Sequence, residues 1–339
     1  MVDIKTVDYE ALRGGAGCIV LADRRWIALS GQERVDYLQG LLTNDIAALS
    51  SGTGCYAAHL TPQGRLVADM YVFTETDRVL LDVHDSAKDL LCERFNDFII
   101  SEDVRVSDLS HQLSAYGVHG PRAAEILSVV VDMDPTSLDV YEHCPIVVCG
   151  SPGVIARTDD LGIAGYRVIV ESETVINLGQ ALIEAGALEV GETATAAVRI
   201  ESGRPLFPID MNAETIPMEA GIEDRAINFD KGCYVGQEVI IRILHRGRGR
   251  VARRLVGLTL DIGDERDYSL QYTGAPILFA NAEVGQVTSV ALSPAIGTVV
   301  ALGYVPREIA DEPGVVLEVV VGSLNVNAVV TKLPFVPTL

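Results

Sequence analysis

Apolar residues repeat with a period of two in some parts of the first two thirds of the chain and with a helical period in others. The strand-like runs lie at 26–31, 54–73, 78–84, 113–120 and 165–172, and Thr61-Pro62-Gln63-Gly64 predicts a hairpin turn inside the second run. The helix-like runs lie at 33–49, 86–100, 174–186, 193–203 and 236–244, with a further helix opened by Gly120-Pro121. Strands and helices that alternate in this way predict an α+β body.

The pattern changes after about residue 250, where helical spacing disappears. Six short β-branched runs separated by Gly, Pro or Asn follow, at 253–260, 275–280, 283–292, 298–305, 314–322 and 325–333. Short strands at this density are typical of a small antiparallel barrel or sandwich. We therefore predict an α+β body at 1–249, made of two intertwined subdomains, and a C-terminal β-barrel domain at 250–339.

Composition places the chain among ordinary globular proteins and limits its partners. The formal net charge is −21 and 48% of the residues are hydrophobic, yet no apolar run approaches the roughly 18 residues that span a bilayer. The N-terminal segment carries acids early and lacks the apolar stretch of a signal peptide. We expect a cytoplasmic protein with no membrane contact, and the negative charge makes direct binding of nucleic acid unfavourable.

Cysteine spacing and short motifs exclude several classes of site. The chain has six cysteines, none in a C-x-x-C pair, so we expect neither a disulfide framework nor a metal site. The phosphate-binding pattern G-x-x-x-x-G-K-[ST], the nucleophile elbow G-x-S-x-G and the dinucleotide pattern G-x-G-x-x-G do not occur. Their absence argues against nucleotide hydrolysis, α/β-hydrolase chemistry and a Rossmann cofactor site.

The segment "DKGCYVGQE" at 230–238 carries the most distinctive local chemistry. Gly232 and Gly236 allow tight turns on both sides of Cys233, Lys231 adds a positive charge, and a helix is expected to begin near Gly236. A nearby cation and a helix N-terminus both favour thiolate over thiol. Local chemistry leaves two interpretations open, a reactive or metal-binding Cys233 and a small buried side chain in a glycine turn.

A basic cluster follows this segment. Six arginines stand within thirteen positions, at Arg242, Arg246, Arg248, Arg250, Arg253 and Arg254. Such a loop could bind a chain of phosphates or carboxylates. Alternatively, it is a solvated connector whose arginines pair with surface acids.

The octapeptide "KGCYVGQE" resembles the signature of the YgfZ family, folate-binding relatives of the glycine-cleavage T-protein, an aminomethyltransferase. The segments "VDYLQGLLTNDI", "HLTPQGRLVADMYVF", "RIESGRPLFPID" and "IPMEAGI" resemble further family segments in the same order. The resemblance implies three subdomains around a central folate-holding cavity, the last a small antiparallel β-barrel. It also implies a tetrahydrofolate-binding accessory protein, rather than a turnover enzyme, for iron–sulfur cluster assembly or repair. Its partners would be iron–sulfur client or assembly proteins, and it would support tRNA modification indirectly.

The resemblance also assigns residues. Cys233 matches the family's functional thiol, with Lys231 beside it. The residues expected to contact tetrahydrofolate are Asp69, Arg199, Glu201, Tyr234, Gln237, Glu238 and Arg242, and the arginine loop would receive the glutamyl tail of the folate.

Two departures from the T-protein pattern bear on the activity. The T-protein carries an Asp-Asp pair where this chain has Ala68-Asp69, and an acid where it has Ile163. Aminomethyl transfer needs amine and folate nitrogens held by carboxylates, so we rank a folate-dependent aminomethyltransferase second. A third alternative, an RNA-binding module that uses the arginine loop, is disfavoured by the net charge.

Overall fold

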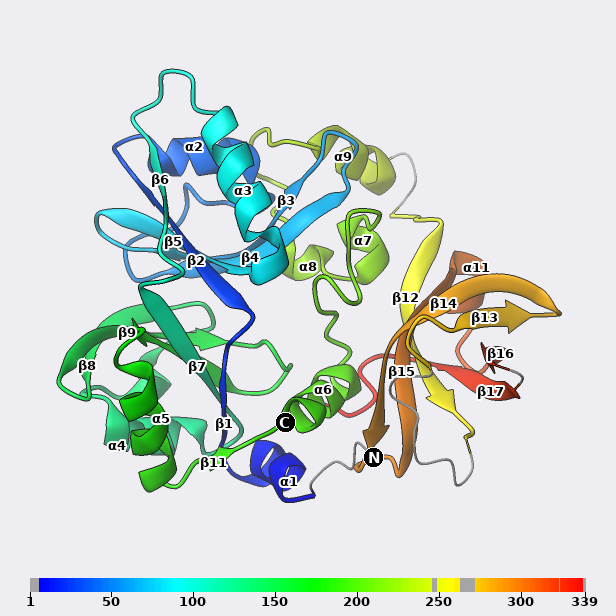
Figure 1. The fold of residues 1–339 in the computed structure, drawn as a ribbon. Helices are drawn as coiled ribbons and strands as arrows, with labels where there is room; N and C mark the ends of the chain where they lie inside the picture. Colours follow the sequence, from blue (N-terminus) through cyan, green and yellow to red (C-terminus); the bar gives the residue numbers. More distant parts are fainter. Residues whose placement is uncertain (1–5, 246–248, 263–271, 323, 338–339) are drawn as a thin grey trace.

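The computed structural model describes residues 6–245, 249–262, 272–322 and 324–337. Two sheets and a barrel make up three subdomains, with short helices between them (Figure 1). This arrangement confirms the predicted α+β body with a C-terminal antiparallel β-barrel. None of the described helices is both long and apolar enough to cross a membrane.

The first sheet has five strands in the order β3-β4-β5-β2-β6. Its strands are β2 (Arg24–Ser30), β3 (Gly54–Leu60), β4 (Leu66–Thr74), β5 (Arg78–His84) and β6 (Arg105–Asp108). The predicted hairpin is confirmed, because β3 and β4 pair antiparallel and Gly64 between them has a φ of +71°. Helices α2 (Arg34–Leu41) and α3 (Asp85–Asp97) pack against this sheet.

The helix at 33–49, in which Gly40 and Asn44 are candidate breaks, is shorter than its apolar spacing predicts. Helix α2 ends at Leu41, and Leu42 is already extended. The reason is that the polar residues after it bond elsewhere: Thr43 donates its hydroxyl to the Ala226 carbonyl, and Asn44 donates its amide to the Tyr56 carbonyl. These bonds compete with continued helix.

The second sheet has six strands in the order β11-β1-β7-β10-β9-β8. They are β1 (Gly17–Val20), β7 (Leu113–His119), β8 (His143–Val148), β9 (Ser151–Thr158), β10 (Gly165–Glu171) and β11 (Leu188–Glu189). Helices α4 (Ala123–Val130) and α5 (Val175–Glu184) pack on one face. Ala115 and Ile169, on the other face, belong to the core of the first sheet, so the two sheets share a buried junction.

The six β-branched runs all form strands of one closed barrel in the order β12-β15-β14-β13-β16-β17. Its strands are β12 (Arg253–Leu260), β13 (Pro276–Phe279), β14 (Ala282–Ser293), β15 (Thr298–Pro306), β16 (Val316–Val321) and β17 (Leu324–Thr331), with α11 (Arg307–Ala310) beside them. After β17 the chain returns to the body, where Phe335 N–H donates to the Glu201 carbonyl at 2.8 Å. The division of the chain into two domains at residue 249 stays a prediction.

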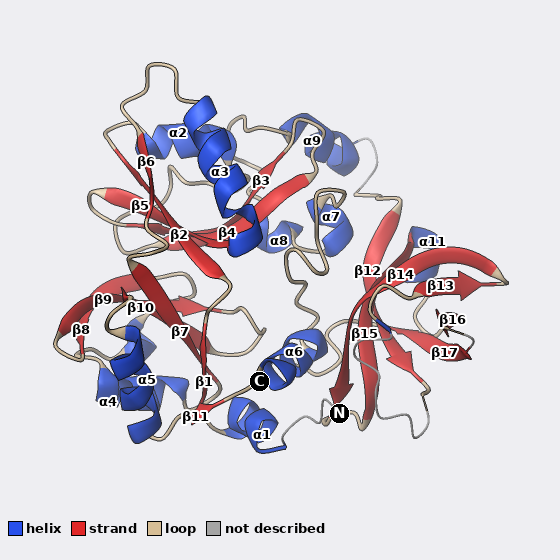
Figure 2. Cartoon of the chain, viewed as in Figure 1, coloured by secondary structure: helices blue, strands red, loops and turns tan. Residues whose placement is uncertain are grey.

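Short helices connect the subdomains (Figure 2). They are α1 (Thr6–Gly14), α6 (Glu192–Glu201), α7 (Pro217–Ala220), α8 (Glu223–Ala226) and α9 (Gln237–His245), and a 3₁₀ turn, η1, lies at Pro135–Ser137. Helices α1 and α6 share a small core with the barrel residues Val300 and Leu302. They therefore join the second sheet to the barrel.

Candidate functional site

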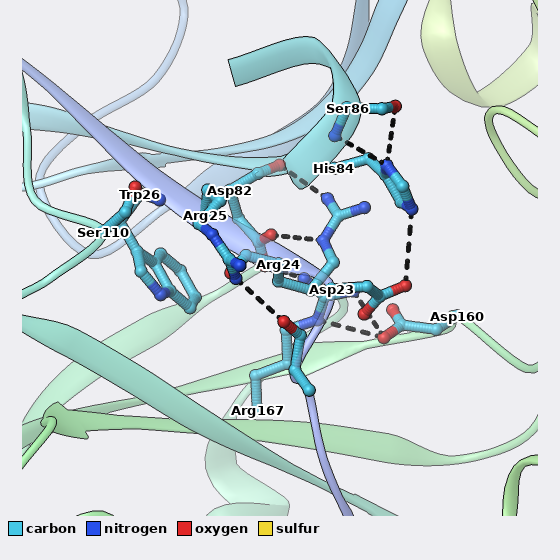
Figure 3. A network of polar contacts seen from close by, with 11 residues as sticks. Asp23, Arg24, Arg25, Trp26, Asp82, His84, Ser86, Ser110, Asp160 and Arg167 are labelled. Atoms are coloured by element: carbon cyan, nitrogen blue, oxygen red, sulfur yellow. Dashed lines mark hydrogen bonds and ion pairs between the residues drawn. The ribbon is translucent and has the colours of Figure 1, made fainter. Parts of the chain in front are cut away.

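The junction of the two sheets holds a network of charged side chains (Figure 3). Arg24 on β2 donates through Nε to Asp82 Oδ1 at 2.6 Å. Arg167 on β10 donates through Nη2 to Asp160 Oδ2 at 2.7 Å and contacts Asp82 from the other side. Charges are tolerated in a protein interior only when they are paired in this way.

Arg167 is the centre of this network. Its burial lowers its pKa to about 9, and the nearby charge of Arg24 acts in the same direction. At neutral pH the guanidinium is still protonated, because its pKa remains above 7. It therefore needs the carboxylates of Asp82 and Asp160 that face it.

Three tyrosines form an aromatic wall beside the network. The ring centroid of Tyr71 lies 5.3 Å from that of Tyr56 and 5.9 Å from that of Tyr141. Guanidinium groups cover two of these rings, Arg167 at 4.3 Å over Tyr71 and Arg225 at 4.6 Å over Tyr56. We call these side chains together the junction cluster. Its members are Arg24, Asp82, Asp160, Arg167, Arg225, Tyr56, Tyr71 and Tyr141. Planar rings and cations in contact form a surface that suits a flat, electron-rich ligand.

Asp69 on β4, a predicted folate contact, lies in the junction cluster. Its Oδ2 accepts the Tyr56 hydroxyl at 2.6 Å, while its buried Oδ1 has no hydrogen-bond partner among the described residues. Burial, and next the charge of Asp69, raise the pKa of Tyr56 well above its usual value, so the phenol remains a donor. Within the described ranges no basic side chain forms an ion pair with Asp69. Asp69 is thus a buried acceptor positioned for a donor from elsewhere.

Arg199 and Glu201, two other predicted folate contacts, lie between α6 and the barrel. Glu201 is fully buried and accepts hydrogen bonds from Tyr9 at 2.8 Å, from Arg13 and from Ser293. Arg199 donates to Asp210 at 2.7 Å and to Ser289. Both side chains therefore tie α6 to its neighbours, and their contact with folate stays a prediction.

The ammonium group of Lys231 is enclosed by backbone carbonyls. Its Nζ donates to the carbonyl oxygens of Gln39, Leu42 and Asn44, each at 2.7 Å. The Tyr234 ring lies 5.2 Å from the same nitrogen. Burial lowers the pKa of Lys231 to about 8, so the amine is protonated at neutral pH. Lys231 thereby secures the end of α2 and the loop after it.

We expect Lys231→Met to lower the free energy of unfolding by about 3 kcal/mol, because three carbonyls lose their donor. Denaturation in urea, followed by circular dichroism, measures the change. Lys88→Met is the matched control. Among the described residues Lys88 pairs with the carboxylates of Asp89 and Asp108 at the surface, so its loss should cost less than about 1 kcal/mol. Equal effects of the two substitutions would contradict the structural role of Lys231.

Cys233 is exposed, in the loop that leads into α9. Gln237 Nε2 lies 3.5 Å from the Gly232 carbonyl, and both Glu238 and Arg242 are exposed on α9. None of these four side chains contacts the junction cluster in the part of the chain that the structure describes. Their roles in thiol chemistry and in folate binding stay predictions.

The arginine cluster is only partly visible, since Arg246 and Arg248 lie outside the described residues. Arg253 pairs with Glu219 at 3.1 Å and Arg254 pairs with Asp311 at 3.3 Å. For these two arginines the structure agrees with the alternative of a connector that pairs with acids.

Most of the junction cluster was not predicted from the sequence. Asp82 and Arg167 each stand between buried apolar or aromatic residues in the middle of a strand, in "RVLLDVH" and "GYRVIVE". A charge in the middle of a buried strand needs a partner, so this signal was present. The tyrosines gave no comparable signal, because aromatic residues are common in strands.

Known proteins resemble the chain over nearly its whole length. The model of the GCVT N-terminal domain matches residues 1–231, and that of the glycine cleavage T-protein C-terminal barrel domain matches residues 253–337. An aminomethyltransferase from Rippkaea orientalis is 30% identical over 97% of this chain and 88% of its own length. One from Bacillus subtilis is 28% identical over 97% of this chain and 90% of its own length.

A solved structure shares the fold. The glycine cleavage system aminomethyltransferase T from Bartonella henselae superposes with a TM-score of 0.85, at 21% identity, over 97% of this chain and 89% of that one. The superposition therefore extends over all three subdomains described above.

The expectation of an accessory protein for iron–sulfur cluster assembly is wrong. The relatives that match 97% of the chain are named aminomethyltransferases, which favours the activity that we ranked second. The iron–sulfur clients and the link to tRNA modification have no support among these relatives. The chain belongs to the glycine cleavage T-protein family.

Proposed function

We propose that this protein is a tetrahydrofolate-dependent aminomethyltransferase. The observation that carries the proposal is Asp69, a buried carboxylate with one unpartnered oxygen inside a cluster of tyrosines and arginines. The names of its relatives and the shared fold support the same activity.

The junction cluster suits the pteridine ring of a folate. The ring is flat and aromatic, and its edge carries N–H donors, so it can pack against Tyr56 and Tyr71 while an N–H reaches Asp69 Oδ1. The neighbouring Arg167 is already neutralised by Asp82 and Asp160 and is not needed as a counter-ion. Asp69 would therefore orient the ring.

Asp69 can also assist the transfer. When the carbon of an aminomethyl group leaves its donor, positive charge develops on that carbon, and a carboxylate in a low-dielectric site stabilises it. The T-protein acids that correspond to Ala68 and Ile163 are missing here. Asp69 would thus be the principal carboxylate of the reaction in this chain.

An assay of the transfer step tests the proposal. The purified protein is mixed with an aminomethylated lipoyl carrier protein and tetrahydrofolate, and the formation of methylenetetrahydrofolate is followed by chromatography. We expect turnover that depends on both substrates and on the protein. Product formation no faster than in protein-free controls, with a correctly folded protein, would refute the proposed function.

The motif around Cys233 supports a finer assignment within the family. We propose that the chain belongs to the YgfZ branch, because "KGCYVGQE" places a cysteine where the T-protein has none. The assignment concerns sequence relationship. Its functional consequence is that the Cys233 thiol contributes to the reaction.

We expect Cys233→Ser to lower the transfer rate by at least about tenfold, equivalent to about 1.4 kcal/mol in the barrier. The melting temperature should not change, because an exposed side chain contributes little to packing. Cys149→Ser is the matched control, since Cys149 is also exposed. If Cys233→Ser is as active as the wild type, Cys233 has no part in the transfer.

A further inference from the structure

Besides Asp82 Oδ2, which is ion-paired with Arg167 Nη1, three more buried side-chain atoms near Arg167 have no hydrogen-bond partner among the described residues. They are Asp69 Oδ1, Asp160 Oδ1 and His119 Nδ1. Asp160 is hydrogen-bonded to Arg167, and the charge of Asp69 acts on Arg167. His119 and Arg167 lie on the same face of the second sheet, where they pair with Gly165 and Gly117 on the neighbouring strands.

His119 is held as a neutral acceptor. It is 2% exposed, and burial lowers its pKa, opposed only in part by the charge of Asp160. A neutral imidazole with its hydrogen on Nε2 presents a lone pair at Nδ1. Gly117 and Gly165 leave room for the ring, because a Cβ at either position would collide with an imidazole nitrogen. The backbone is therefore shaped around this side chain.

The three acceptors define the ligand that would satisfy them. A buried acceptor without a donor costs about 1–3 kcal/mol, and native proteins rarely leave several in one place. Two carboxylate oxygens and one imidazole lone pair are best satisfied by a small, positively charged group that donates hydrogen bonds and accepts none. An ammonium ion or a primary ammonium group has at least three N–H donors and a single positive charge.

We propose that Asp69, Asp160 and His119 form an amine subsite of the transferase, which holds the nitrogen that the one-carbon unit leaves behind. This inference rests on the proposed function. In the reaction, the carbon of D–CH2–NH2 forms two bonds to tetrahydrofolate nitrogens and breaks its bonds to the donor atom D and to the amine. The two N–H protons of tetrahydrofolate end on D and on the amine, so D–H and ammonia are released.

In this subsite Asp160 and His119 have roles that are separate from binding the pteridine ring of the folate. Asp160 is a positioning residue for Arg167 through Oδ2 and an amine acceptor through Oδ1. His119 can accept an N–H from the leaving amine, which holds it close to the transferred carbon until the bond breaks. Asp69 is shared between the amine and the folate.

Binding can be measured without turnover. The full-length protein is titrated with methylammonium, and the ring nitrogens of its histidines are followed by long-range ¹H–¹⁵N NMR, with the His119 signal assigned from His119→Gln. We expect saturable shifts at His119 Nδ1 and no change at His143, a buried histidine on β8. Tetramethylammonium, which has the charge but no N–H, should leave His119 unchanged.

Substitutions test the acceptor set. Asp160→Asn should weaken methylammonium binding by at least about tenfold, the loss expected for a charged hydrogen bond. Asp77→Asn, which removes an exposed carboxylate in the turn before β5, should change it by less than about twofold. If Asp160→Asn does not fold, the selectivity of wild-type His119 for methylammonium over tetramethylammonium still tests the proposal.

The outcomes separate this inference from the proposed function. Methylammonium binding at His119 without any transfer activity would support the subsite and refute the transferase. Transfer activity without a response of His119, or an equal response to tetramethylammonium, would refute the subsite alone. A His119 shift that tetrahydrofolate produces and methylammonium does not would assign these acceptors to the pteridine edge and overturn the proposal.

Discussion

Asp69→Asn is expected to reduce the rate of methylenetetrahydrofolate formation by about a thousandfold, within the range for loss of a catalytic charge. The asparagine oxygen can still accept the Tyr56 hydroxyl, so the fold should be retained. What is lost is the negative charge on the buried Oδ1. Single-turnover kinetics with saturating tetrahydrofolate measure the transfer step directly.

Two comparison variants make this result specific. Tyr56→Phe removes one hydrogen bond to Asp69 but keeps the carboxylate, so we expect a loss of only about tenfold. Asp77→Asn replaces an exposed acid in the turn before β5 and should have no effect on the rate. Full activity of Asp69→Asn, or a loss that follows unfolding, would contradict the role of Asp69.

Local patterns predicted most of the fold because the subdomains are built from local signals. The six β-branched runs became the six strands of the barrel, and the turn chemistry at 61–64 placed the β3–β4 hairpin. Strands β8 and β9 were missed, since their burial alternates irregularly and "HCPIVV" contains a proline. Helix α2 was predicted too long because the residues after it bond to segments distant in the sequence, among them Ala226 and Lys231.

The candidate site could be predicted only in part. Asp69 was identified from the family resemblance, and it does lie in the junction cluster. Its partner Tyr56 comes from the adjacent strand β3, but Arg167 and Asp160 belong to the second sheet and the turn before β10. Only the packing of the two sheets brings these two residues into the same cluster as Asp69. The spacing of residues along the chain does not indicate such packing.

Lys231 makes contacts that its place in the sequence does not reveal. Its position two residues before Cys233 suggested a cation that activates the thiol. In the fold its ammonium is occupied by three carbonyls of another segment. The activation of the Cys233 thiol by Lys231 stays a prediction.

Glu201 is expected to be essential for stability. It is fully buried and accepts hydrogen bonds from Tyr9 and Arg13 of α1 and from Ser293 of the barrel. Glu201→Ala leaves the largely buried guanidinium of Arg13 without its counter-ion, which typically costs about 3–5 kcal/mol. The free energy of unfolding, measured in urea without folate, should fall by this amount. Glu192→Ala, at the exposed start of the same helix, should cost less than about 1 kcal/mol.

A double-mutant cycle separates this structural role from the predicted folate contact. Removing both charges with Arg13→Met and Glu201→Gln avoids the unpaired guanidinium, so the double variant should be more stable than Glu201→Gln alone. A folate contact would instead leave the stability of the ligand-free protein unchanged and weaken only tetrahydrofolate binding, measured by calorimetry. Since the Glu201 carboxylate is already surrounded by three donors from two subdomains, we expect the loss of stability. An unchanged unfolding free energy in Glu201→Ala would show that these contacts do not hold the barrel to the body.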